Sequence, residues 1–366
     1  MQPQQPADRR ESVGTLLYLG LNEQRAQEIW QHWVQVDPDK YDGDFGDHAR
    51  GRLRNLVQTE RCDIDERGAD WNASLREIGA NEDLVKAITQ RGPEYDGVRL
   101  RYSAAEWVDL TIAARWEHLL SDAKATGVPA VAGQHPQVQV ISGEDVTGLT
   151  YDPETHRVTD RHGERPDYVP FWKACTRVRA EQMWSGDCRT GDFALKPLLS
   201  PAPSDFCGRT QVYAFTPDLD AAQHAARFAQ ALCHPAGVCL VRIEVPAKLW
   251  ADTPRLELRW PSREWQQVVF CSRRSDPVTP KDLQRRYLAA QLLIGDTTTG
   301  SSGQYGKMRE AADVNDECLL TLPPVDRPVT QFGFGHGTSD DFEEAINGLA
   351  HKITIRHHEK PNMTLD

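Results

Sequence analysis

Hydrophobic residues in the first third of the chain recur every three to four positions, which is the spacing of amphipathic helices. One such helix follows Asn22, whose side chain suits a helix N-cap, and a later one begins near Ser103. The apolar positions of the four expected helices are Ala26, Ile29, Trp30, Trp33 and Val34; Phe45, Ala49, Leu53, Leu56 and Val57; Trp71, Leu75, Ile78, Leu84, Val85 and Ile88; and Trp107, Leu110, Ala114 and Leu120. Each helix has one apolar stripe that must be buried, so we expect a helical domain over residues 13–126.

From residue 168 onward the pattern changes to short segments of alternating apolar and polar residues, which indicate strands. The expected strands are 171–176, 211–215, 238–245, 255–260, 265–271, 289–294, 329–334 and 352–356. Helices are expected at 217–232, with Thr216 as its N-cap, at 281–287 and at 340–350. Strands outnumber helices and do not alternate with them regularly, so residues 168–366 are expected to form an α+β domain rather than a doubly wound sheet.

The remaining segments are polar or rich in turn-forming residues. Residues 1–12 lack the apolar core of a signal peptide, and we expect a disordered tail there. Residues 127–167 are expected to be a linker. Within it, the turn-forming residues 152–154 separate two short strand-like segments, which predicts a small hairpin.

Composition narrows the class of protein. The 366 residues are 39% hydrophobic and 26% charged, which is typical of a soluble globular protein, and no apolar run is long enough to cross a bilayer. The formal net charge of −12 argues against general nucleic-acid binding, because phosphates require a basic surface. The eight cysteines form no CxxC pair, so we expect no metal site. Without a secretion signal they are expected to be reduced thiols of an intracellular protein, cytoplasmic or nuclear.

Three blocks of the C-terminal domain, taken in order, resemble a known family. They are DFCGRTQVYAFTPDLDAAQHAARFA at 205–229, PSREWQQVVFCSRR at 261–274 and AAQLLIGDTTTG at 289–300. Together they resemble a bacterial domain of unknown function allied to the ADP-ribosyltransferase superfamily, and fungal proteins with a helical N-terminal part look similar. The resemblance implies a split, strongly bent antiparallel sheet that holds NAD in a central cleft as co-substrate.

The resemblance also implies a site. The chemistry is attack at the nicotinamide ribose carbon through an oxocarbenium-like state, so the site needs a group for the sugar or phosphates, an aromatic wall and a carboxylate. Lys173 stands where the family has an Arg or His in the first strand. The candidate cofactor-binding residues are Lys173, Arg177, Tyr213, Phe215 and Trp265. The simpler explanation of Trp265 is that it is a core residue.

The catalytic groups implied by the resemblance are incomplete. Tyr213 and Thr216 supply the hydroxyls of the second motif, although Thr216 is also explained as a helix cap. Gln267 stands where the catalytic Glu is expected, and an amide does not act as a base or stabilise a cation as a carboxylate does. Glu264 and Asp296 are the nearby acids. The candidate catalytic residues are therefore Lys173, Tyr213, Thr216, Gln267 and Asp296.

Two functions stay open. The first is NAD-dependent ADP-ribosyl transfer or NAD glycohydrolysis by a domain with an atypical or degenerate triad, acting on a protein acceptor that the sequence does not identify. The second is a non-catalytic interaction protein, a pseudoenzyme that keeps the fold and binds a partner through its helical part.

Overall fold

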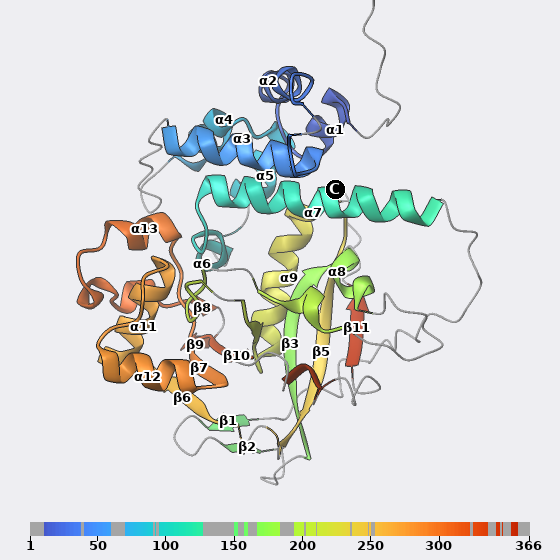
Figure 1. Ribbon diagram of the computed structural model, residues 1–366. Helices are drawn as coiled ribbons and strands as arrows, with labels where there is room; N and C mark the ends of the chain where they lie inside the picture. Colours follow the sequence, from blue (N-terminus) through green and yellow to red (C-terminus); the bar gives the residue numbers. More distant parts are fainter. Residues whose placement is uncertain are drawn as a thin grey trace, which may run out of the picture. The chain divides into compact units, whose positions relative to one another are not determined.

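The computed structural model describes residues 11–37, 40–59, 70–90, 92, 95–126, 150–152, 157–159, 167–183, 194–200, 203–209, 211–234, 236–247, 249, 253–322, 325–335, 342–344, 346 and 353–357 (Figure 1). The fold is α+β, as expected. The chain divides into two compact units: residues 1–132 with 231–236, and residues 133–230 with 237–366. The expected disordered tail, apart from its last two residues, and most of the expected linker lie outside the described residues.

The first unit is helical. Its helices are α1 (Val13–Tyr18), α2 (Glu23–Trp33), α3 (Phe45–Thr59), α4 (Trp71–Ile78), α5 (Glu82–Thr89), α6 (Asp96–Arg99) and α7 (Ala104–Thr126). The Asn22 side chain accepts a hydrogen bond from the Arg25 N–H, so the predicted cap is confirmed. Ser103 and Glu106 form a reciprocal capping box at the start of α7.

One expected helix is two. The single helix predicted from Trp71 to Ile88 is interrupted at Gly79, which ends α4 in the left-handed region with φ +100°. Asn81 then caps α5 by accepting from the Leu84 N–H. Glycine tolerates positive φ without a Cβ clash, and Gly79 therefore allows the chain to break here. The apolar residues keep helical spacing on both sides of the break, which is why the sequence predicts one helix.

Among the residues that the structure describes, the second unit contains two sheets of more than two strands. The first has the order β4 (Tyr213–Phe215), β10 (Thr330–Phe334), β7 (Leu292–Asp296) and β6 (Arg255–Leu258), and the second has the order β11 (Ile353–His357), β5 (Val238–Pro246) and β3 (Tyr168–Thr176). Neighbouring strands are antiparallel except for the parallel pair β6 and β7. A single bridge between Trp172 and Thr216 joins β3 to β4. Two further pairs are β1 (Thr150–Asp152) with β2 (Arg157–Thr159), the expected hairpin, and β8 (Thr321–Leu322) with β9 (Val325–Pro328).

The described helices of the second unit include α8 (Arg177–Gln182), α9 (Leu219–Cys233, whose end belongs to the first unit), α11 (Arg263–Arg273), α12 (Lys281–Ala289) and α13 (Ser302–Lys307). The strand predicted at 265–271 is wrong, because this segment is the middle of α11. Ser262 caps the helix by accepting from the Trp265 N–H, and Trp265, Val268, Val269 and Ser272 are buried at helical spacing. The Val-Val-Phe-Cys run is typical of a strand, because β-branched and aromatic residues favour strands. The N-cap at Ser262 is the local signal that indicates a helix instead.

Each face of the sheet that contains β7 covers a separate core. The inner core lies between the two sheets and combines Phe171 of β3 and Ile243 of β5 with Phe215, Ile294 and Phe332 of the facing sheet. The outer core packs the opposite face against α11, α12 and α13. Its largest members are Trp265, Phe206, Tyr287 and Tyr305, with Leu293 from β7. Residues that alternate along β7 therefore belong to different cores.

Candidate functional site

Lys173 lies where β3 and β4 diverge. By strand alternation it shares the inner face of β3 with Phe171 and Cys175, which belong to the inner core. Its ammonium donates to Ser200 Oγ at 2.6 Å and to the Ala214 carbonyl oxygen at 3.1 Å. Its Nζ also lies 5.8 Å from the centre of the Phe215 ring. The Lys173 side chain therefore lies beside β4, and its ammonium is hydrogen-bonded to a hydroxyl and a backbone carbonyl of the protein.

Tyr213 and Phe215 are brought to the same inner face, as their two-residue spacing on β4 requires. Tyr213 is fully buried, and its hydroxyl donates to the carboxylate of Glu343. Sequence reasoning missed Glu343. Its only local signal was its place in the predicted helix 340–350, of which the structure describes residues 342–344 and 346 as helical.

The segment that carries Glu343 also covers the inner face with an aromatic ring. The ring of Phe342 stacks on that of Phe334, with centroids 4.5 Å apart, and lies 5.5 Å from the ring of Tyr213. Ile346, one turn later, is 1% exposed and belongs to the same core. The inner face beside Tyr213 is therefore packed with apolar side chains.

Thr216 does not cap α9, contrary to the prediction. The helix begins at Leu219, and the carboxylate of Asp218 accepts from the Ala221 N–H at 3.2 Å. The Thr216 hydroxyl instead accepts from the Asp218 N–H at 3.1 Å, and the Thr216 backbone forms both hydrogen bonds of the bridge to Trp172. Thr216 therefore fixes the junction of the two sheets and the entry to the helix.

Asp296 ends β7 and is held in an ion pair. Arg259 donates to its carboxylate at 2.9 Å, and the Trp260 N–H donates to the second oxygen at 2.8 Å. Its side chain is 10% exposed. Arg259 also donates to the hydroxyl of Thr330, the register partner of Asp296 on β10. The charge of this carboxylate is therefore compensated by groups on neighbouring elements.

Trp265 and Gln267 lie on α11 and not on a strand. Trp265 is fully buried in the outer core, where its indole N–H donates to the Asp296 carbonyl oxygen at 2.8 Å. Gln267 donates to Cys271 Sγ and Thr279 Oγ1, at 3.3 and 3.0 Å. Trp265 thus supports β7 from the face opposite Phe215. The structure does not bring Gln267 to the groups around Lys173.

Arg177 is the first residue of α8, where it forms an ion pair with Glu181 in which the two side chains are 58% and 49% exposed. Cys175 lies two residues beyond Lys173 on the inner face. Burial raises the pKa of the Cys175 thiol to about 11, although the charges of Lys173 and Arg179 oppose the shift. A protonated thiol is a poor nucleophile, so this cysteine does not supply one at neutral pH.

The three blocks that carry the family resemblance meet in a buried polar network. Arg273 of the second block donates to Asp205 of the first block at 2.8 Å and to the Thr298 hydroxyl of the third at 3.2 Å. The other Asp205 oxygen accepts from the Thr298 N–H at 2.9 Å. The presence of Arg273, Asp205 and Thr298 in the three blocks is therefore explained by their contribution to the fold, without a role in binding or catalysis.

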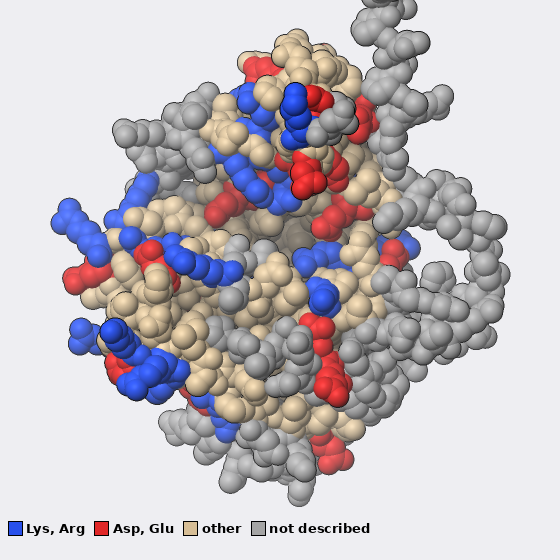
Figure 2. All heavy atoms as spheres, viewed as in Figure 1, with Lys and Arg blue, Asp and Glu red and all other residues tan. Residues whose placement is uncertain are grey.

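Basic side chains gather on the surface of α12 (Figure 2). Figure 2 shows Lys and Arg over α12, on the left of the view. The exposed members are Arg263, Lys281, Arg285 and Arg286, and Arg286 is paired with Glu264. Within the described part of the chain, no group of three or more His, Cys, Asp or Glu side chains is placed to hold a metal ion, and no helix has the length and apolarity that crossing a bilayer requires.

No protein-family model, curated protein or solved structure matches this chain. The relation to ADP-ribosyltransferases is therefore an interpretation of three sequence blocks. The geometry offers two groups of residues for it. Lys173, Tyr213, Phe215 and Glu343 lie around β4 on the inner face, while Asp296 and Trp265 lie at the end of β7.

Proposed function

We propose that this chain is a non-catalytic interaction protein whose C-terminal unit keeps a split-sheet frame without consuming NAD. The observation that carries the proposal is the packing around Tyr213, which is fully buried under Phe342 and Phe334. Protein interiors are close-packed, so a nicotinamide ring enters this face only by displacing these rings.

The polar candidates support the same proposal, because each already bonds to the protein. The carboxylate of Asp296 is paired with Arg259, and the ammonium of Lys173 is bonded to Ser200 and to a backbone carbonyl. A group that stabilises an oxocarbenium-like state must present its charge to the sugar. In this structure the two charged groups present themselves to protein partners instead.

NAD turnover by the full chain is the direct test. We expect no release of nicotinamide by chromatography and no NAD-dependent change in Tm, with an active NAD glycohydrolase as positive control. Release of nicotinamide by the wild-type chain that is lost in Glu343→Gln would overturn the proposal. Arg177→Gln, a change in an exposed ion pair at 58% exposure, is the matched control variant.

A second function, NAD-dependent ADP-ribosyl transfer or NAD hydrolysis, is favoured by one observation: the hydrogen bond between Tyr213 and Glu343. It supplies a carboxylate, bonded to the strand that also carries Phe215, that the sequence blocks lack. In this function Lys173 holds a phosphate as a point charge, Phe215 faces the nicotinamide and Glu343 stabilises the ribosyl cation. It requires Phe342 to move away, so Phe342→Ala is expected to raise the rate of nicotinamide release.

A further inference from the structure

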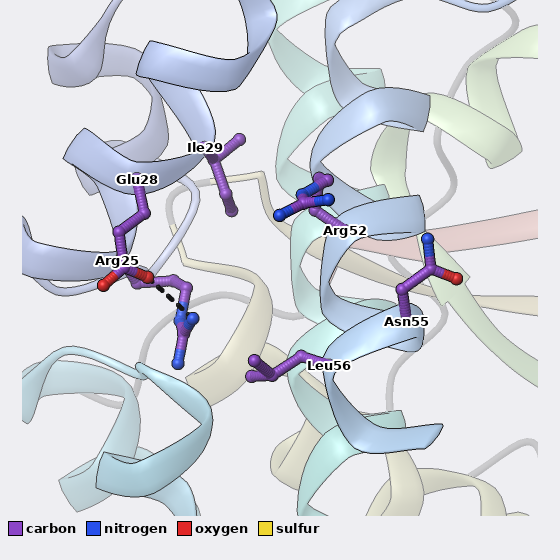
Figure 3. A pocket seen from close by; sticks show the side chains of 6 residues that line it. All are labelled: Arg25, Glu28, Ile29, Arg52, Asn55 and Leu56. Atoms are coloured by element: carbon purple, nitrogen blue, oxygen red, sulfur yellow. Dashed lines mark hydrogen bonds and ion pairs between the residues drawn. The ribbon is translucent and has the colours of Figure 1, made fainter. Parts of the chain in front are cut away.

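The helical unit contains a pocket of about 180 Å³ between α2 and α3 (Figure 3). Two matching sets of side chains line it: Arg25, Glu28 and Ile29 from α2, and Arg52, Asn55 and Leu56 from α3. Both sets have the spacing i, i+3, i+4, so each occupies one face of its helix. The pocket is therefore built by two helix faces that turn toward each other.

The charges that line the pocket are unbalanced. Arg25 Nη1 donates to one oxygen of Glu28 at 2.7 Å, and Gln24 donates to the other oxygen at 3.0 Å. Glu28 and Arg25 therefore compensate each other. Arg52 is exposed and has no hydrogen-bond or ion-pair partner among the residues that the structure describes. The lining keeps one net positive charge, on the α3 side.

Arg25 does not supply a second free donor to the pocket. Its terminal nitrogens donate to Glu28 and to the Glu77 carbonyl oxygen. Its Nε is buried and lies against Gly79, the residue that ends α4. The guanidinium of Arg52 on α3 is thus the group of the lining that calls for an acidic acceptor.

The rest of the lining selects the kind of acid. Leu56 is half-buried and provides apolar surface next to the largely buried Ile29, which favours a ligand with a short hydrocarbon portion. A guanidinium matches the planar carboxylate by two parallel hydrogen bonds. The nearby carboxylate of Glu28 repels a second negative charge, which disfavours a phosphate dianion. The pocket fits one carboxylate on a short apolar stem.

We propose that this pocket binds a carboxylate on a short hydrocarbon stem, supplied by a glutamate side chain of a partner polypeptide. The proposal rests on the proposed function, in which the helical unit binds a partner. A free small carboxylate shares this chemistry, and the experiment separates the two sources.

The test is isothermal titration of the full chain with the peptide acetyl-Ala-Leu-Glu-Leu-Ala-amide, with its Glu→Gln counterpart and with butyrate. We expect the Glu peptide to bind at least about tenfold more tightly than the Gln peptide and than butyrate. Arg52→Gln should weaken Glu-peptide binding by at least about tenfold. Arg54→Gln is the matched control, because Arg54 lies on the same helix and pairs with Asp109 instead.

Several outcomes would overturn the proposal. They are equal binding of the Glu and Gln peptides, binding that Arg52→Gln leaves unchanged, no binding of any probe, or tighter binding of inorganic phosphate. If butyrate binds as tightly as the peptide, the ligand of this pocket is a small carboxylate and not a partner polypeptide. None of these results bears on nicotinamide release, so failure of this site and failure of the non-catalytic function are distinguished.

Discussion

Arg273 and Asp205 form an ion pair in which the two side chains are 3% and 0% exposed. The pair joins the end of α11 to the segment that precedes β4, 68 residues earlier. Thr298, in the loop after β7, bonds to both partners. The guanidinium also lies over the ring of Tyr305, 5.3 Å from its centre. Three distant segments are thus held in register by one buried charge pair.

Breaking this pair should strongly destabilise the C-terminal unit. Arg273→Met leaves the Asp205 carboxylate buried without its cation, which costs about 3–5 kcal/mol of unfolding free energy. Urea denaturation followed by circular dichroism measures the loss. The control is Arg177→Met, which removes an exposed ion pair and should change the free energy by less than about 1 kcal/mol. Equal effects of the two variants would contradict the interpretation.

Arg115 should be as important in the helical unit. This buried guanidinium donates from Nε and Nη2 to the Leu232 carbonyl oxygen, at 3.2 and 2.9 Å, and from Nη1 to the Tyr18 carbonyl oxygen at 2.9 Å. Leu232 lies in the last turn of α9, whose free carbonyl groups attract cations. Burial leaves the charge of Arg115 poorly solvated and therefore lowers its pKa.

Arg115→Met should therefore destabilise this unit by about 2–4 kcal/mol, because two carbonyl groups lose a charged donor. Native-state hydrogen exchange of the α7 amides measures the effect. Arg76→Met, which removes an exposed pair with Glu82, is the control and should leave the exchange rates of α7 unchanged. Protection that is equal in the two variants would show that Arg115 does not stabilise the unit.

Helices were predictable where the local chemistry is complete. Asn22 and the apolar stripe after it define α2 within one segment of chain, without help from distant residues. α11 was predicted wrongly as a strand, because its apolar residues fit a strand about as well as a helix. The N-cap at Ser262 is the local feature that distinguishes the helix from the strand. Tertiary burial of Trp265 then fixes the helical choice.

The candidate site was predictable only in part, because most of its contacts are long-range. Strand alternation places Tyr213 and Phe215 on one face. The Tyr213 hydroxyl, however, bonds to Glu343, 130 residues later, and the Lys173 ammonium bonds to Ser200, 27 residues later, and to Ala214, 41 residues later. Nothing in the local pattern around 343 separates its carboxylate from the neighbouring acids.

The helical unit should lose stability in mild acid because of His48. This side chain is 5% exposed, and its ring lies 5.1 Å from that of His32. Burial lowers the pKa of His48, and the charges of His32 and Arg52 lower it further. The unfolded chain therefore takes up a proton below about pH 6.5 that the folded chain resists, and the free energy of unfolding falls as pH decreases.

Urea denaturation of the wild-type chain should give a lower midpoint at pH 5.5 than at pH 7.5, monitored by tryptophan fluorescence. His48→Phe keeps a ring against Trp33 and Tyr41 but cannot titrate, so the difference between the two midpoints should shrink. A difference of the same size in His48→Phe would assign the acid sensitivity to other groups.

Cys175 and Cys239 should make the C-terminal unit sensitive to alkali. They are register partners on β3 and β5, and both are free and buried. Burial raises the pKa of Cys175 to about 11 and that of Cys239 to about 12 from the ordinary 9.0. Above pH 9 the unfolded thiols ionise while the folded thiols stay protonated. The contribution of these thiols to the free energy of unfolding is therefore fully present below pH 9. It decreases toward pH 11–12, by up to about 1.4 kcal/mol per pH unit for each thiol.

Cys239→Ala should be less stable than the wild type at pH 8, because a buried side chain is shortened, but its stability should fall less steeply between pH 8 and pH 10.5. Comparing the two slopes removes the contribution of lysine and tyrosine side chains that both proteins share. Mass spectrometry after iodoacetamide treatment at pH 8.5 gives an independent measurement. Both thiols should be unmodified in the folded chain and modified in urea, and rapid labelling of the folded chain would show that they are accessible thiolates.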